Sequence, residues 1–115
     1  MRLVIIDDHC DLAEVMADFL REEGYRVHTA CSGKKGVSLV LRFKPDVVFC
    51  DFEMPGIKGD EVVRTLRSQK YKGHIIAYTV GDHSIRMIEA GCNGFISKKA
   101  LPSELCDYVK KIRQQ

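Results

Sequence analysis

Apolar and polar residues alternate along this chain in two rhythms. Short apolar runs, bounded by charged residues, glycine or proline, predict five β-strands, at residues 3–6, 25–30, 47–50, 75–79 and 95–96. Between and after them, apolar residues recur at three- and four-residue steps. This spacing predicts helices from 12 to near 24, from 32 to 44, and at 60–68, 85–89 and 101–112.

Strands that alternate with helices form a parallel sheet with right-handed crossovers and helices on both faces. We therefore expect an α/β fold with a five-stranded, doubly wound, flavodoxin-like sheet, for which the strand order 2-1-3-4-5 is common. In the first helix we expect the apolar face to consist of Leu12, Val15, Met16, Phe19 and Leu20. In the third helix we expect Val62, Val63 and Leu66 to point inward.

Polar residues follow the predicted strands at one edge of this sheet. In such folds ligands bind outside the carboxyl ends of the strands, where strands 1 and 3 are neighbours. Asp7 and Asp8 follow the first strand and Asp51 follows the third. Thr79 ends the fourth strand, and Lys98 follows the fifth. We expect these five side chains to converge.

The converging residue types favour phosphoryl chemistry assisted by a metal ion. Three carboxylates in one pocket repel one another unless a cation joins them. Oxygen ligands with room for water suit Mg²⁺, and Mn²⁺ is also possible. A carboxylate such as Asp51 can then attack a phosphoryl group to form an aspartyl phosphate. Lys98 can take up phosphate charge and Thr79 can bond a phosphate oxygen.

Each of these residues also has an ordinary structural explanation. Asp8 or Asp11 could cap the first helix, and Thr79 is a common type of residue at a strand end. Lys98 alone would be a surface lysine. Gly56 and Gly59 could serve only the turn after Pro55. The conjunction of these residues at the strand ends, rather than any one of them, favours a functional site.

The composition of the chain argues against nucleic acid and membranes as its partners. The chain has 115 residues, 45% of them apolar and 30% charged, with a net charge of +2, which fits one globular domain over residues 1–115. No basic stretch is interleaved with aromatic residues, so we expect no direct binding to nucleic acid. The apolar runs are too short for a membrane span, so we expect no membrane contact and a cytoplasmic location.

The five cysteines are odd in number and none lie in C-x-x-C spacing. We expect Cys10, Cys31, Cys50, Cys92 and Cys106 to be reduced, small core residues. The closely spaced ligand pairs of a zinc site are absent from the sequence.

The sequence resembles the receiver domain of two-component response regulators over essentially its whole length. The matching pieces are Ile-Asp-Asp at 6–8, Pro-Asp at 45–46, Asp51 with Met54-Pro55-Gly56 and Gly59, Thr79, Ala90-Gly91, Gly94-Phe95 and Lys98.

The resemblance implies a role for each matching residue. Asp51 would accept a phosphoryl group from a sensor histidine kinase or a histidine phosphotransfer protein. Asp8, Asp51 and the backbone carbonyl of Glu53 would hold Mg²⁺, with Asp7 acting through water. Lys98 would pair with the phosphoryl group. Thr79 would move toward it and Phe95 would turn inward, a two-state switch read by a downstream effector protein or domain.

Four features depart from the family's usual pattern. Val80 follows the threonine where a small residue is usual, and Lys99 follows the lysine where proline is usual. The segment from Thr79 to Lys98 is shorter by roughly one helical turn. The carboxylate of Glu53 would add negative charge near the metal. From the short segment we expect an atypical output surface and a mainly monomeric domain.

Two other functions remain open from the sequence. A degenerate receiver would bind a partner without being phosphorylated, an alternative that Val80, Lys99 and the short segment motivate. A phosphatase of the haloacid dehalogenase type also uses an aspartate at a strand end, with a second acid two residues later, as in Asp51-Phe52-Glu53. That second acid is normally aspartate, and the chain is too short for such an enzyme's usual core and cap. We therefore expect a signalling phosphoacceptor with at most slow self-phosphorylation and self-dephosphorylation, and not an enzyme.

Overall fold

A parallel sheet of five strands lies at the centre of the molecule, in the order β2-β1-β3-β4-β5. The computed structural model describes residues 1–114. The predicted fold class and strand order are both confirmed. The strands are β1 (Arg2–Ile6), β2 (Arg26–Ala30), β3 (Val47–Cys50), β4 (His74–Thr79) and β5 (Gly94–Ser97).

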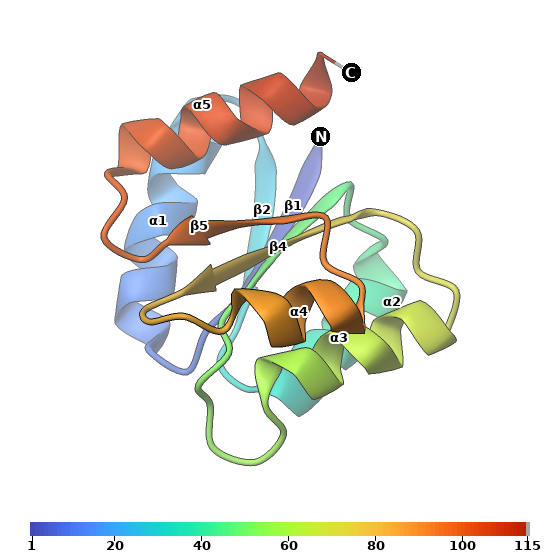
Figure 1. Ribbon diagram of the computed structural model, residues 1–115. Coiled ribbons are helices and arrows are strands. Elements are labelled where there is room, and N and C mark those ends of the chain that lie inside the picture. The colour runs from blue at the N-terminus through green and yellow to red at the C-terminus, as the bar shows by residue number, and fades with distance from the viewer. Residues whose placement is uncertain (115) are drawn as a thin grey trace.

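Helices cover both faces of the sheet, as expected for right-handed crossovers (Figure 1). The helices are α1 (Cys10–Glu22), α2 (Gly33–Phe43), α3 (Gly59–Ser68), α4 (Ser84–Ala90) and α5 (Pro102–Arg113). Because side chains alternate along a strand, β1 contributes to both halves of the core. Leu3 and Ile5 pack with residues of α1 and α5, whereas Val4 and Ile6 pack with residues of α2, α3 and α4. None of the helices in residues 1–114 is both long enough and apolar enough to cross a membrane.

The buried face of α1 differs from the stripe that the sequence pattern predicts. Leu12, Val15 and Phe19 are 38%, 49% and 44% exposed. The buried residues of this helix are Ala13, Met16, Ala17 and Leu20. The two alanines lie one turn apart on the side that faces the sheet, where small side chains let the helix approach closely. Leu12, Val15 and Phe19 therefore lie beside this face or away from it, while Met16 and Leu20 are buried as predicted.

Gly36 explains how α2 lies so close to the sheet. A Cβ atom at this position would lie 2.6 Å from Cδ1 of Ile6, a residue of β1. Glycine is unfavourable inside a helix, at a cost of about 1 kcal/mol relative to alanine. Here it removes a collision between the helix and the strand.

The prediction that all five cysteines are reduced is wrong for two of them. Cys10 and Cys31 form a disulfide, with their Cα atoms 5.4 Å apart. The pairing follows from the sheet: β1 and β2 are neighbours, and their ends at Ile6 and Ala30 are in register. Cys10 and Cys31 follow those two ends. The cytoplasmic location stays a prediction.

The other three cysteines are free thiols. Cys50 and Cys106 are buried and Cys92 is partly buried, in agreement with the prediction of small core residues. Burial raises the pKa of the Cys50 thiol well above its ordinary value, and neighbouring acids including Asp51 act in the same direction.

Candidate functional site

Two aspartates, Asp7 and Asp51, lie side by side and buried at the carboxyl ends of β1 and β3. The backbone N–H of Asp51 donates to the carbonyl of Ile6 at 2.9 Å, so the pairing of β1 with β3 continues one residue past the end of β3. Asp51 therefore lies beside Asp7. Asp7 is 0% exposed and Asp51 is 3% exposed. Carboxylates at this depth need compensating partners.

Lys98 is such a partner. Its Nζ lies 2.8 Å from Oδ2 of Asp51 and 2.8 Å from Oδ2 of Asp7. The contact with Asp51 is a hydrogen bond, whereas the contact with Asp7 is an ion pair without hydrogen-bond geometry. The backbone N–H of Lys98 donates to the carbonyl of Thr79 at 3.2 Å, which fixes the lysine just past the ends of β4 and β5. The arrowheads of these two strands point to the same edge (Figure 1).

Burial and the contacts between Asp51 and Lys98 shift the pKa values of both residues. Burial raises the pKa of Asp51, and the contacts with Lys98 oppose this shift without cancelling it. For Lys98, burial acts to lower the pKa, but the contacts with Asp51 and Asp7 outweigh it and the pKa is raised. The lysine is therefore held in its charged form between two acids that burial has desolvated.

Asp7, Asp8 and Asp51 have the chemistry of a site for a hard divalent cation. Each offers a carboxylate oxygen, and these oxygens lie within 4.8 Å of one another and of a ring nitrogen of His9. Oδ1 of Asp8 is buried and has no hydrogen-bond partner among the described residues. A buried oxygen of this kind needs a donor or a cation. These residues fit Mg²⁺, which one or two carboxylates and several waters typically hold.

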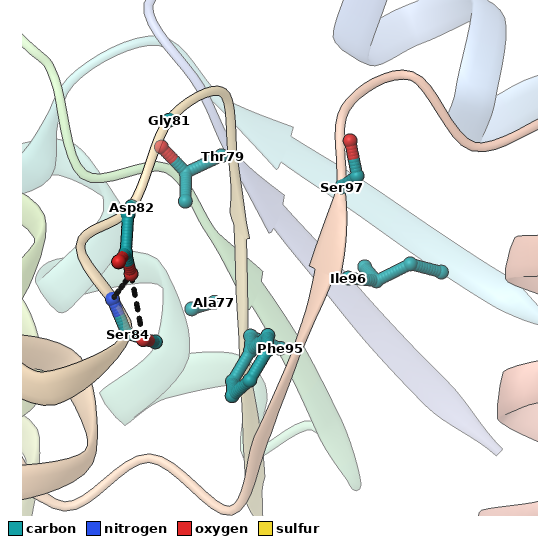
Figure 2. A pocket seen from close by; sticks show the side chains of 8 residues that line it. All are labelled: Ala77, Thr79, Gly81, Asp82, Ser84, Phe95, Ile96 and Ser97. Atoms are coloured by element: carbon teal, nitrogen blue, oxygen red, sulfur yellow. Dashed lines mark hydrogen bonds between the residues drawn. The ribbon is translucent and has the colours of Figure 1, made fainter.

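Thr79 and Phe95 line a pocket of about 250 Å³. In Figure 2 the residues that line the pocket come from β4, β5 and the segment that leads into α4. The hydroxyl of Thr79 donates to the carbonyl of Val80 at 3.1 Å, and the residue is 8% exposed. Phe95 is 53% exposed. The pocket is thus a space between a buried hydroxyl and an aromatic ring that is largely outside.

A family model describes most of this chain. Residues 3–110 match the model of the response regulator receiver domain. This chain is a receiver domain. Among solved structures, it is 33% identical to a putative response regulator from Chloroflexus aurantiacus, with a TM-score of 0.85 and coverage of 99% of this chain and 98% of that one.

Two further structures show the same fold. A BeF3-activated N-terminal receiver domain of RstA from Klebsiella pneumoniae is 26% identical, with a TM-score of 0.89 and full coverage of both chains. A CheY-like receiver domain protein from Methanospirillum hungatei is 22% identical, with a TM-score of 0.90 and coverage of 96% of this chain and 90% of that one.

The loop after Asp51 explains why this receiver domain needs Gly59. The N–H of Gly59 donates to the carbonyl of Phe52 at 2.9 Å, so α3 begins directly against the segment that follows β3. A Cβ atom at Gly59 would collide with the backbone of Asp51 and Phe52. The requirement is therefore a close approach of two backbones, and turn chemistry alone does not account for this glycine.

The structure brings together most of the residues singled out in the sequence, while their chemical roles stay predictions. Asp7, Asp8, Asp51, Lys98 and Thr79 lie at the same edge of the sheet. The Glu53 side chain is 60% exposed and pairs with Lys58 at 3.1 Å. The role of its backbone carbonyl also stays a prediction.

The ordinary explanation for two of the acids does not hold. The residue at the N-cap of α1 is His9, and neither Asp8 nor Asp11 occupies that position. His9 lies together with Asp7, Asp8 and Asp51, and it is the one residue of these four that the sequence pattern did not predict for the site. Its place directly after Asp8 was the available signal.

Three of the four departures from the family pattern have a structural counterpart. All peptide bonds in residues 1–114 are trans, including the one between Lys98 and Lys99. The helix α4 has seven residues, whereas the other four have between 10 and 13. Val80, directly after Thr79, is 55% exposed.

Proposed function

We propose that this receiver domain accepts a phosphoryl group on Asp51 and changes conformation in response. The observation that carries the proposal is the contact of Lys98 with Asp51 at 2.8 Å inside a buried set of acids. A carboxylate that accepts a phosphoryl group needs a rigid position, a nearby cation and a place for the added negative charge. The cluster offers all three.

The transfer is a displacement at phosphorus. One oxygen of the Asp51 carboxylate attacks the phosphorus of a phosphohistidine on a sensor histidine kinase or a histidine phosphotransfer protein. The bond between phosphorus and the histidine nitrogen breaks, and the electron pair stays with that nitrogen. Lys98 stabilises the charge on the phosphoryl oxygens. Asp8, Asp51 and the carbonyl of Glu53 would hold Mg²⁺, which supplies further positive charge, with Asp7 acting through water.

The pocket between Thr79 and Phe95 supports a switch that reports the phosphorylation. A new phosphoryl group on Asp51 offers oxygen acceptors to the Thr79 hydroxyl, whose partner is now the carbonyl of Val80. Movement of Thr79 toward them would leave room in the pocket of about 250 Å³ that Phe95 lines. Phe95, which is 53% exposed, would then gain apolar contacts by turning inward. A downstream effector protein or domain would read this change.

Two alternatives are less well supported. A degenerate receiver would be expected to lack part of the reactive set, and this chain has the acids, the lysine and the hydroxyl in one place. A phosphatase of the haloacid dehalogenase type needs its second acid directed at the reacting phosphate. Glu53 instead pairs with Lys58. We accordingly propose a signalling module with at most slow self-phosphorylation and self-dephosphorylation, located in the cytoplasm.

The test is mass spectrometry of the intact protein after incubation with acetyl phosphate and Mg²⁺. We expect one added phosphoryl group, lost in Asp51→Asn and retained in the control Asp60→Asn, whose carboxylate pairs with Arg64. Modification that persists in Asp51→Asn would contradict the assignment of the acceptor. An unmodified wild-type protein would favour the degenerate receiver.

A further inference from the structure

His9 faces the acids of the site with a nitrogen atom. Its Nδ1 lies 3.4 Å from Oδ1 of Asp7 and 3.4 Å from Oδ1 of Asp8. The backbone of the same residue is fixed, since its N–H donates to Oδ1 of Asp7 at 3.0 Å. The ring nitrogen and the oxygens of all three acids lie within 4.8 Å of one another.

The His9 ring lies close to both acids without a hydrogen bond to either carboxylate. A good N–H···O bond spans about 2.7–3.2 Å, and both contacts of the His9 ring are longer. Oδ1 of Asp8 is buried and has no hydrogen-bond partner among the described residues, although the His9 ring is its neighbour. Two ligands at right angles on one ion, each bound at about 2.1 Å, lie about 3.0 Å apart. A shift of a few tenths of an ångström would bring Nδ1 and Oδ1 of Asp8 to that separation.

We propose that His9 supplies a nitrogen ligand to the divalent cation of this site, so that the site discriminates borderline first-row metals from Mg²⁺. Imidazole suits transition metals, whereas a purely carboxylate, carbonyl and water set suits Mg²⁺, Ca²⁺ and Mn²⁺. The inference rests on the proposed function in one respect, namely that a metal binds between Asp8 and Asp51. It adds a specificity-determining residue to that site.

A different role for His9 predicts the opposite result. A protonated His9 ring could act as a counter-charge to Asp7 and Asp8 in the metal-free protein, and an incoming cation would displace it. Removal of the ring would then strengthen binding of every divalent cation. Under our proposal, removal weakens binding of those metals that prefer nitrogen and leaves Mg²⁺ binding nearly unchanged.

The experiment measures dissociation constants for Co²⁺ and for Mg²⁺ by calorimetry on the wild type, His9→Ala and His83→Ala. His83 is a matched control because it also lies beside an acid near this edge, with its Nε2 3.9 Å from Oε1 of Glu53. We expect the preference for Co²⁺ over Mg²⁺ to fall about tenfold or more in His9→Ala, because even residues that only orient a metal ligand typically contribute 10–100-fold to affinity. The preference should be unchanged in His83→Ala. The His9 side chain is 69% exposed, so the substitution should leave folding intact.

A spectroscopic measurement tells whether His9 binds the metal directly or only lies near it. Electron spin-echo spectra of the Cu²⁺-loaded wild type should contain modulation from a bound imidazole, because imidazole suits Cu²⁺, and His9→Ala should lose it. The proposal is overturned by an unchanged metal preference in His9→Ala, by tighter binding of both ions, or by spectra without that modulation. A wild type that binds neither ion would also overturn the metal part of the proposed function. Binding that is indifferent to His9 would overturn this inference alone.

Discussion

Nζ of Lys98 lies 2.8 Å from Oδ2 of Asp51, although 47 residues separate the two in the sequence. The contact depends on the order of the sheet, because β4 lies between β3 and β5. The carboxyl ends of three neighbouring strands thus place a cation on an acid that burial has desolvated. The same lysine also reaches Asp7, so one positive charge serves two buried acids.

Replacing Lys98 by alanine should slow phosphorylation of Asp51 by about tenfold or more, since removing one group that stabilises developing charge commonly costs a factor of 100 or more. The initial rate with acetyl phosphate and Mg²⁺, followed by mass spectrometry, measures this. Lys99→Ala is the control, because Lys99 is the adjacent residue and is exposed. Equal rates for Lys98→Ala and the wild type would remove Lys98 from the transfer step.

Replacing Asp8 by asparagine should have opposite effects on the metal-free and metal-bound protein. Without metal, the substitution removes repulsion among Asp7, Asp8 and Asp51 and should raise the free energy of unfolding by up to about 1 kcal/mol. Binding of Mg²⁺ should weaken, so the stabilisation that Mg²⁺ confers should shrink. Melting with and without Mg²⁺ measures both effects, with Asp11→Asn as the control at an exposed position of α1. Undiminished Mg²⁺ binding in Asp8→Asn would count against Asp8 as a ligand.

The sequence predicted the elements from their periodicity, and the sheet order from what is common for alternating strands and helices. The residues that meet at the edge then follow from which residues end the strands. All ten predicted elements are present, with bounds that differ by a few residues. The buried face of α1, which was predicted only in part, shows the limit of that reasoning. Of the predicted stripe, Met16 and Leu20 are buried, whereas Leu12, Val15 and Phe19 are exposed. Ala13 and Ala17 take their place on the buried face. Periodicity alone does not tell how closely a helix approaches its neighbours.

Two features depend on contacts between distant segments and could not be read from local patterns. The Cys10–Cys31 disulfide follows from the register of β1 with β2, which a separation of 21 residues does not disclose. The need for Gly59 follows from the backbone of Asp51 and Phe52 beneath it. In both cases the residue type has a plausible local explanation, but the actual reason is a contact with a segment that is distant in the sequence.

Reducing the Cys10–Cys31 disulfide should destabilise the protein. The bond closes a loop with a sequence separation of 21, for which the loss of chain entropy in the unfolded state predicts about 3 kcal/mol of stabilisation. We expect the melting temperature to fall by about 10 °C when a reductant is added. Cys10 is exposed, so the reductant can reach it.

Variants separate this bond from the other thiols. The double variant Cys10→Ser with Cys31→Ser should melt at the same temperature with and without reductant. Cys92→Ser, which alters a free cysteine, should keep the sensitivity of the wild type. A wild type that melts identically under both conditions would show that this bond contributes nothing measurable to stability.

The face formed by α4, β5 and α5 should not support a stable dimer. With seven residues, α4 is about 10 Å long, and its exposed apolar residues are Ile85 and Ile88, at 70% and 52% exposure. A stable interface typically buries about 800 Å² on each partner. A helix this short supplies only part of that area. We therefore expect the beryllofluoride-bound protein to remain mainly monomeric in sedimentation at tens of micromolar.

The variant Ile88→Glu makes the sedimentation result decisive. In a monomer an exposed glutamate on α4 changes nothing, so the sedimentation coefficient should equal that of the wild type. If the wild type instead sediments as a tight dimer and Ile88→Glu dissociates it, α4 builds an interface despite its length and the prediction is wrong. A dimer that survives Ile88→Glu would place the interface elsewhere, and the exposed residues of α1, Val15 and Phe19, would be the next to vary.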